Sequence, residues 1–207
     1  MLTNKGDISN YLGVNIKKNS DRTFELLQSN LVEKIINHVR LTVPVSLNSR
    51  ETPEVKPLLY SDEYSLGRKC MWNYRAEAGM LNYLLGLTRP EIALAVHQCA
   101  KFINNPRLMH ERVVRIIAKN LASTSTYMDL LDENLRLITC GIVYMSCIEK
   151  GIKCYVDFDL SSGWDQADSD IAENVMSRTG FLIMYAVCPL FWCSKLQIDT
   201  ALSTIEA

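Results

Sequence analysis

Two aspartates, Asp157 and Asp159, end an apolar stretch in the sequence GIKCYVDFDL, which covers residues 151–160. Because side chains alternate along a strand, residues 157 and 159 would share one face of a sheet. Carboxylate oxygens are the ligands that Mg²⁺ prefers, and bound divalent ions can activate water for hydrolysis. The pair therefore indicates either the beginning of a metal site or two solvated residues at the end of a strand.

Four basic residues form a second candidate site. Their spacing is close to helical, around a helix predicted near residues 109–122: Arg107, Arg112, Arg115 and Lys119. Cations at this spacing can follow a nucleic-acid backbone, or they can be the solvated face of an ordinary helix. The whole chain has a net charge of −1, so any contact with nucleic acid would depend on such a local cluster.

The seven cysteines and three histidines do not indicate zinc, because no Cys-x-x-Cys pair occurs and the histidines are scattered. We expect most of the cysteines to be buried thiols. No apolar stretch is long enough to span a membrane, and the N-terminus lacks the apolar core of a signal peptide. These features predict a cytoplasmic or nuclear protein without a membrane partner.

The elements that would position these residues begin with strands. Alternating apolar residues predict a strand at 11–17, and residues 24–28 are a candidate return strand of a hairpin. Asn30 and Glu33 have the spacing of a capping box, which predicts that a helix begins there. Prolines in residues 42–70 then indicate an extended connection.

The rest of the chain divides into helices and then strands. Apolar residues at helical spacing predict helices at 72–87, 91–103 and 109–122, and their short connections indicate a small bundle. An apolar stretch at 135–148 has mixed periodicity. Strands are expected at 153–158, 180–187 and 190–194, with Cys188-Pro189 as a tight link between the last two. The fold class predicted from this order is α+β.

Several motifs occur in an order that resembles the Pol polyprotein of copia-type LTR retrotransposons. They are YLGV at 11–14, the block YRAEAGMLNYLLGLTRPEIALAVHQCAKFINNP at 74–106, His110, CYVDFDL at 154–160, SRTGFLI at 177–183 and FWCSKLQIDTALSTIEA at 191–207. The chain departs from the family at Glu91, where an aspartate is usual, and at Phe158, where a small residue is usual. Within the family's polyprotein, the chain resembles the region from the end of the reverse transcriptase to the start of the ribonuclease H domain.

This resemblance implies three parts. Residues 1–70 would be the end of the palm-like region and a linker, residues 71–130 a thumb-like helical bundle, and residues 131–207 the truncated antiparallel sheet of a ribonuclease H-like domain. The sheet would then expose an edge and one face, because its covering helices would be missing. The implied partner is an RNA–DNA hybrid or a template-primer, contacted by the four basic residues.

The resemblance also assigns the aspartates. Asp157 corresponds to the first Mg²⁺ ligand of the ribonuclease H site, and Asp159 is a neighbour with a less certain role. The family's next glutamate would fall just past Ala207, although Glu206 is an alternative, and the polymerase's adjacent aspartate pair would precede Met1. We therefore expect a polyprotein fragment that is non-catalytic as this chain and does not bind Mg²⁺ tightly. The alternative is a co-opted non-enzymatic module that binds nucleic acid or a protein partner.

Overall fold

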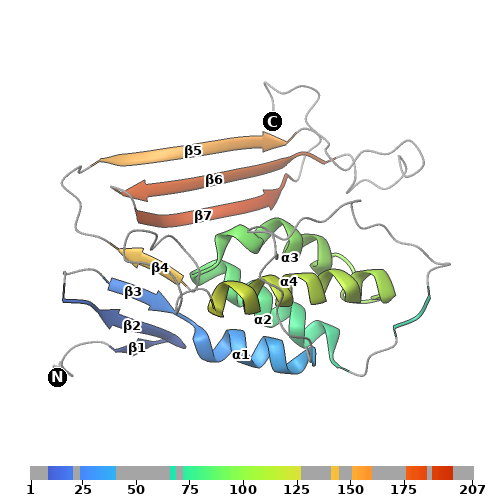
Figure 1. Cartoon of the computed structure of the whole chain (residues 1–207). Helices are drawn as coiled ribbons and strands as arrows, with labels where there is room; N and C mark the ends of the chain where they lie inside the picture. Colours follow the sequence, from blue (N-terminus) through green and yellow to red (C-terminus); the bar gives the residue numbers. More distant parts are fainter. Residues whose placement is uncertain are drawn as a thin grey trace, which may run out of the picture. The chain divides into compact units, whose positions relative to one another are not determined.

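The computed structural model describes residues 9–20, 24–40, 66–68, 72–126, 141–144, 151–159, 176–185 and 188–197. The chain divides into two compact units, Met1–Met145 and Ser146–Ala207. Helices and strands occur in separate stretches of the chain (Figure 1), which confirms the predicted α+β class. The predicted boundaries after residues 70 and 130 stay predictions.

The first unit contains an antiparallel sheet with strand order β1-β2-β3-β4. Its first two strands, β1 (Asn10–Tyr11) and β2 (Val14–Lys18), are joined by a tight turn at Leu12 and Gly13. Both turn residues have positive φ angles, 50° and 75°, which suits the right-handed twist of a two-residue hairpin. The prediction of one continuous strand at 11–17 was therefore wrong at its beginning.

Strand β3 (Phe24–Leu27) has a neighbour on each side, β2 and β4 (Gly141–Tyr144). Phe24 pairs with Tyr144 and Leu27 with Gly141. The family resemblance groups residues 141–144 with the C-terminal region, whereas their backbone completes the N-terminal sheet. Nothing local in the sequence could reveal this pairing, because the two strands are far apart along the chain.

Helices follow the first three strands of the first unit and precede β4. They are α1 (Ser29–His38), α2 (Tyr74–Leu87), the 3₁₀ turn η1 (Pro90–Ile92), α3 (Ala93–Ala100) and α4 (Leu108–Thr126). The predicted helices are thus confirmed, with the 3₁₀ turn beginning at Pro90 as proline's fixed φ favours. Helix α2 is capped by Asn73, whose side chain accepts a hydrogen bond from the Ala76 backbone N–H at 3.1 Å.

The predicted capping box at Asn30 was wrong. Helix α1 begins after Gln28, which makes no capping hydrogen bond with its side chain. Gln28 is buried, and its Oε1 accepts a hydrogen bond of 2.8 Å from the Thr88 hydroxyl, at the end of α2. The Gln28 side chain, at the N-cap position of α1, is therefore used for a tertiary hydrogen bond instead of a cap.

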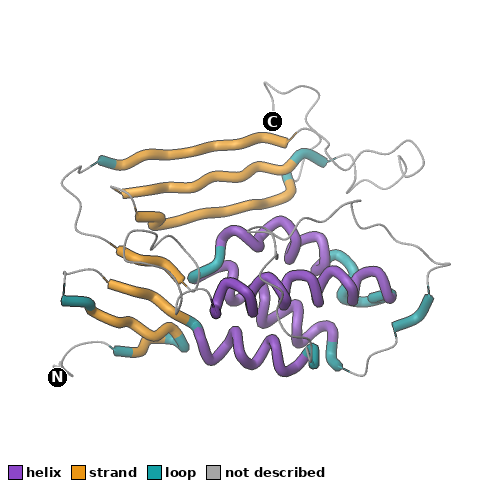
Figure 2. The backbone as a smooth tube through the Cα atoms, in the orientation of Figure 1, coloured by secondary structure: helices purple, strands orange, loops and turns teal. Residues whose placement is uncertain are grey.

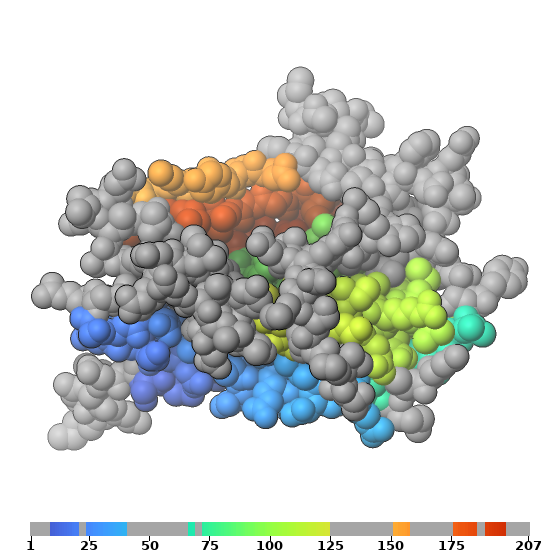
Figure 3. All heavy atoms as spheres, viewed as in Figure 1, coloured from blue at the N-terminus to red at the C-terminus, as the bar shows by residue number. Residues whose placement is uncertain are grey.

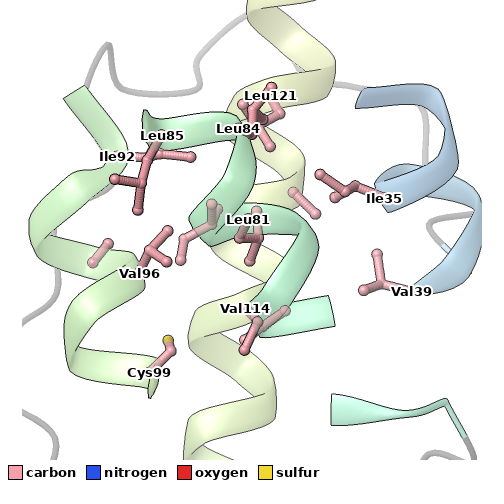
Figure 4. Packing of buried hydrophobic residues seen from close by; sticks show 14 of the residues in the cluster. Ile35, Val39, Leu81, Leu84, Leu85, Ile92, Val96, Cys99, Val114 and Leu121 are labelled. Carbon is pink, nitrogen blue, oxygen red and sulfur yellow. The ribbon is translucent and has the colours of Figure 1, made fainter. Parts of the chain in front are cut away.

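The helices share one hydrophobic core. Ile35 and Val39 of α1 face Leu81 of α2 and Val114 of α4, with Val96 of α3 on the other side of α2 (Figure 4). These side chains are fully buried. Burial of apolar area on this scale is the main favourable contribution to folding, so the helical part of the first unit has its own core.

The second unit contains a three-stranded antiparallel sheet with the order β5-β6-β7 (Figure 2). Its strands are β5 (Ile152–Asp159), β6 (Arg178–Tyr185) and β7 (Cys188–Leu196). The three predicted strands are confirmed. However, Cys188 and Pro189 belong to β7, where they pair with Tyr185 and Met184 beside an irregularity in the register, so they are not the link between strands.

Large apolar side chains of this sheet are exposed on both faces. Val156 and Tyr155 are adjacent on β5 and point to opposite faces, and both are more than half exposed. Phe191 of β7 packs against Phe181 of β6 with ring centroids 5.6 Å apart, yet it also stays exposed. The exposure is thus wider than the single exposed face that the resemblance implied.

Candidate metal and nucleic-acid sites

Asp157 lies in β5 opposite Gly180 of β6, which in turn pairs with Ser194 of β7. The Asp157 side chain is exposed. Gly180 contributes no side chain to this row, and a Cβ built on it would meet backbone oxygens only at 3.9 Å. The carboxylate therefore has open space beside it on its own face of the sheet.

Asp159 is the last residue of β5, and its backbone pairs with that of Arg178. The Arg178 guanidinium donates a hydrogen bond from Nη1 to Ser194 Oγ at 3.3 Å, across the row that contains Asp157. This hydrogen bond places a positively charged side chain on the same face of the sheet as Asp157. Asp157 thus shares its face of the sheet with a cation that was not anticipated, whereas the side chain of Asp159 lies outside what the structure describes, so the shared face stays a prediction.

The side chains described around Asp157 do not make up a tight Mg²⁺ site. Within the described ranges, no group of three or more His, Cys, Asp or Glu side chains could hold a metal ion. Mg²⁺ bound by Asp157 would keep mostly water ligands and would exchange readily. Glu206, the alternative ligand, lies outside the described residues.

The basic residues of α4 do form one surface. Arg112, Arg115 and Lys119 are spaced three and four residues apart, so they share a face of the helix. Arg112 and Lys119 are exposed, and part of α4, coloured yellow-green, reaches the surface in Figure 3. The opposite side of the helix faces the core with Val114, Ile117 and Leu121. We call Arg112, Arg115 and Lys119 the α4 basic face.

Glu111 reduces the positive charge at one end of this face. Its side chain is buried, with Oε1 3.4 Å from Arg115 Nε and Oε2 3.7 Å from Arg68 Nε. Glu111 was not predicted as part of the site, although its spacing of four residues from Arg115 is the usual signal of an ion pair within a helix. Arg112 and Lys119 are therefore better placed than Arg115 to contact an external anion.

Arg107 does not join the α4 basic face. It precedes the helix, and its backbone N–H donates a hydrogen bond of 2.8 Å to His110 Nδ1. His110 is buried and stacks on Phe102, with ring centroids 4.0 Å apart. The histidine thus orients the beginning of α4, which is a structural role.

A buried polar contact that the sequence did not predict joins α1 and α2. His38 Nδ1 lies 2.5 Å from Glu77 Oε2, and Glu77 is fully buried. Burial raises the pKa of the Glu77 carboxyl, while the hydrogen bond from His38 acts in the opposite direction. No sequence signal could reveal the contact, because the residues lie on separate helices joined by a long connection.

The three thiols that the structure describes differ in burial, and the other four cysteines lie outside the described side chains. Cys99 is buried, and burial raises its pKa to about 12. Cys154, however, is exposed on β5, and Cys193 is half-buried on β7. The expectation of mostly buried thiols is therefore wrong for the C-terminal sheet, whose faces are open.

Comparisons with known proteins identify two plant transposons. The chain is 25% identical over 209 residues to the retrovirus-related Pol polyprotein from transposon TNT 1-94 of Nicotiana tabacum, covering 98% of this chain and 14% of that protein. It is 26% identical over 134 residues to the retrovirus-related Pol polyprotein from transposon RE1 of Arabidopsis thaliana, covering 65% of this chain and 8% of that protein. Homologues of the chain, at low identity, are thus retrotransposon polyproteins, and the chain spans a small part of their length.

A shorter relative is aligned over most of its own length. Secreted RxLR effector protein 161 of Plasmopara viticola is 26% identical over 133 residues, which cover 64% of this chain and 79% of that protein. No protein-family model matches the chain, and no solved structure matches it significantly. None of the helices in the described ranges has the length and apolar character needed to cross a bilayer.

Proposed function

We propose that the chain is a piece of a copia-type Pol polyprotein, from the end of the reverse transcriptase to the start of the ribonuclease H region. As this chain, it would bind the backbone of an RNA–DNA hybrid or template-primer without cleaving it, in the cytoplasm or nucleus. Similarity to a retrotransposon polyprotein along 98% of the chain supports the first part of this proposal.

The observation that carries the binding function is the α4 basic face. Arg112 and Lys119 are exposed on one side of a helix whose other side is fixed in the core. A rigid helix that presents cations at regular spacing can contact successive phosphates, and such contacts release counterions from the nucleic acid. Binding should therefore weaken steeply as salt concentration rises.

A salt titration of binding to a labelled RNA–DNA hybrid tests this function. We expect Arg112→Ala and Lys119→Ala each to reduce the slope of log affinity against log salt by about 1. Arg115→Ala should have a smaller effect, because Glu111 already partly neutralises that arginine. Lys34→Ala, at an exposed position of α1, is the matched control and should leave the slope unchanged. Equal slopes for all four variants and the unmodified chain would exclude the α4 basic face as the binding surface.

The proposed absence of cleavage rests on Asp157, the one carboxylate at this site among the side chains that the structure describes. One carboxylate cannot fix two divalent ions in the geometry that phosphodiester hydrolysis requires. We expect hybrid incubated with the chain and Mg²⁺ to stay intact, with Asp157→Asn indistinguishable from the unmodified protein. Mg²⁺-dependent cleavage that Asp157→Asn abolishes would overturn this part of the proposal and leave the binding function standing.

A co-opted module that binds a protein partner is the second candidate. The relevant observation is that the effector from Plasmopara viticola aligns with this chain over 79% of its length, so a segment of this kind can make up most of a short protein. This candidate predicts that hybrid binding by the unmodified chain is no stronger than binding by the Arg112→Ala/Lys119→Ala double variant. A clear difference between them would favour the nucleic-acid function.

A further inference from the structure

Strand β5 forms an exposed edge of the C-terminal sheet. Among the described residues it pairs on one side, with β6, and every residue from 151 to 157 is exposed. In Figure 3 this strand, coloured orange, is visible at the surface. Alternate residues of an edge strand direct unpaired N–H and C=O groups outward, which makes the edge a template for another strand.

The sequence of β5 is complementary to itself in the antiparallel direction. If two copies pair about a two-fold axis at Tyr155, Lys153 of each copy lies directly opposite Asp157 of the other. The same register places Cys154 opposite Val156 and position 152 opposite position 158. Opposite charges facing each other across two strands stabilise the pair, and apolar neighbours add buried area. We propose that two copies of this chain associate through β5 in this register and form a continuous six-stranded sheet.

The charges also exclude the main competing arrangement. Parallel pairing in register would place Lys153 beside Lys153 and Asp157 beside Asp157, and like charges directly opposite are destabilising. The same side chains therefore favour one orientation and oppose the stacking that leads to open-ended aggregation.

The other edge of the sheet is a poorer template. Strand β7 contains Pro189, which has no N–H to donate, and the register beside it is irregular between Ile183 and Met184. Proline and irregular register are both devices that protect edges from pairing. On β5, by contrast, Ile152 is 75% exposed and Val156 is 54% exposed, so a second copy would cover apolar surface there.

Charge reversal in the full-length chain tests the register. Sedimentation equilibrium of the unmodified protein should give a reversible dimer. We expect Lys153→Asp to raise the dissociation constant roughly ten-fold, because two attractive pairs become repulsive, and Asp157→Lys to do the same. The Lys153→Asp/Asp157→Lys double variant should return to near the original value. Lys195→Asp, an equal change on the exposed part of β7, is the matched control and should leave the dimer intact.

A cross-linking experiment keeps the test valid if a charge variant does not fold. Facing residues of an antiparallel pair have Cα atoms close enough for a disulfide. Tyr155→Cys in a Cys154→Ser background should therefore form a covalent dimer on mild oxidation, whereas Lys195→Cys and Cys154→Ser alone should not. The proposal would be overturned if the chain stayed monomeric at high concentration. It would also be overturned by a dimer that neither single charge reversal weakens and that Tyr155→Cys does not trap. The outcome does not depend on whether the α4 basic face binds nucleic acid.

Discussion

The helices of the first unit bury many of their large apolar side chains, whereas the sheet of the second unit leaves several of its own exposed. Leu81 and Val96 are completely buried in the helical core, whereas Phe191 of the sheet is 58% exposed. Helices that pack around a common axis can each direct one apolar stripe inward. A three-stranded sheet has two faces, and nothing in its own strands can cover both. Apolar composition alone therefore does not say where the stability of this chain resides.

Thiol labelling should show the largest difference between the two regions. Cys99 can react only when the helical core opens, so we expect iodoacetamide to modify it at least about 10³-fold more slowly than Cys154. Burial also raises the pKa of the Cys99 thiol to about 12, which leaves little reactive thiolate. Timed labelling followed by peptide mass spectrometry measures both rates. In denaturant the two rates should converge; rates within ten-fold of each other in the folded protein would show that the helical core opens freely.

Matched leucine substitutions should show the second-largest difference between the two regions. Leu81→Ala removes a fully buried side chain and should lower the free energy of unfolding by about 2–5 kcal/mol. Leu190→Ala, at a half-exposed position of β7, should cost less than about 1 kcal/mol. Chemical denaturation followed by circular dichroism gives both values. Leu94→Ala, on the exposed side of α3, is the control that separates the effect of exposure from the effect of the region. It should lower the free energy of unfolding as little as Leu190→Ala does.

The buried acid of the helical region should give the smallest effect, which appears only as a change of stability with pH. Burial raises the pKa of Glu77, so at pH values between its unfolded and folded pKa the native protein holds a proton that the unfolded chain has lost. The stability that Glu77 contributes is therefore complete below the unfolded pKa and falls as pH rises through the folded pKa. Glu77→Gln, which keeps a hydrogen-bonding group beside His38, should remove this decline. The free energy of unfolding is measured for both proteins across that pH window. If it changed with pH in the same way in both, Glu77 would not be the source of the decline.

The helices and the C-terminal strands could be predicted because their signals are local. Val96 and Cys99 of α3, for example, have the spacing of a helix face. The turn between β1 and β2 was missed because Leu12 adopts a positive φ that glycine or asparagine usually signals. The position of Gln28 at the start of α1 depends on its hydrogen bond to Thr88, a contact that no local pattern contains.

The candidate sites were predictable to a similar extent. The strand position of Asp157 and the common face of Arg112 and Lys119 follow from the periods of a strand and a helix. The neighbouring residues that change the chemistry of these sites do not follow from those periods. Gly180 beside Asp157 is set by the pairing of strands, and the inward position of Glu111 depends on Arg68, which belongs to a distant part of the chain.

The pairing of β3 with β4 has a consequence for synthesis on the ribosome. Phe24 and Tyr144 are neighbours in the finished sheet, so all of residues 25–143 must be made before its last strand can join. Until then β3 is exposed on the side that β4 will occupy, and closing such a large loop slows folding. The nascent hairpin is therefore open to wrong pairing while residues 25–143 are made, and a pause that delays residues 141–144 would lengthen that interval.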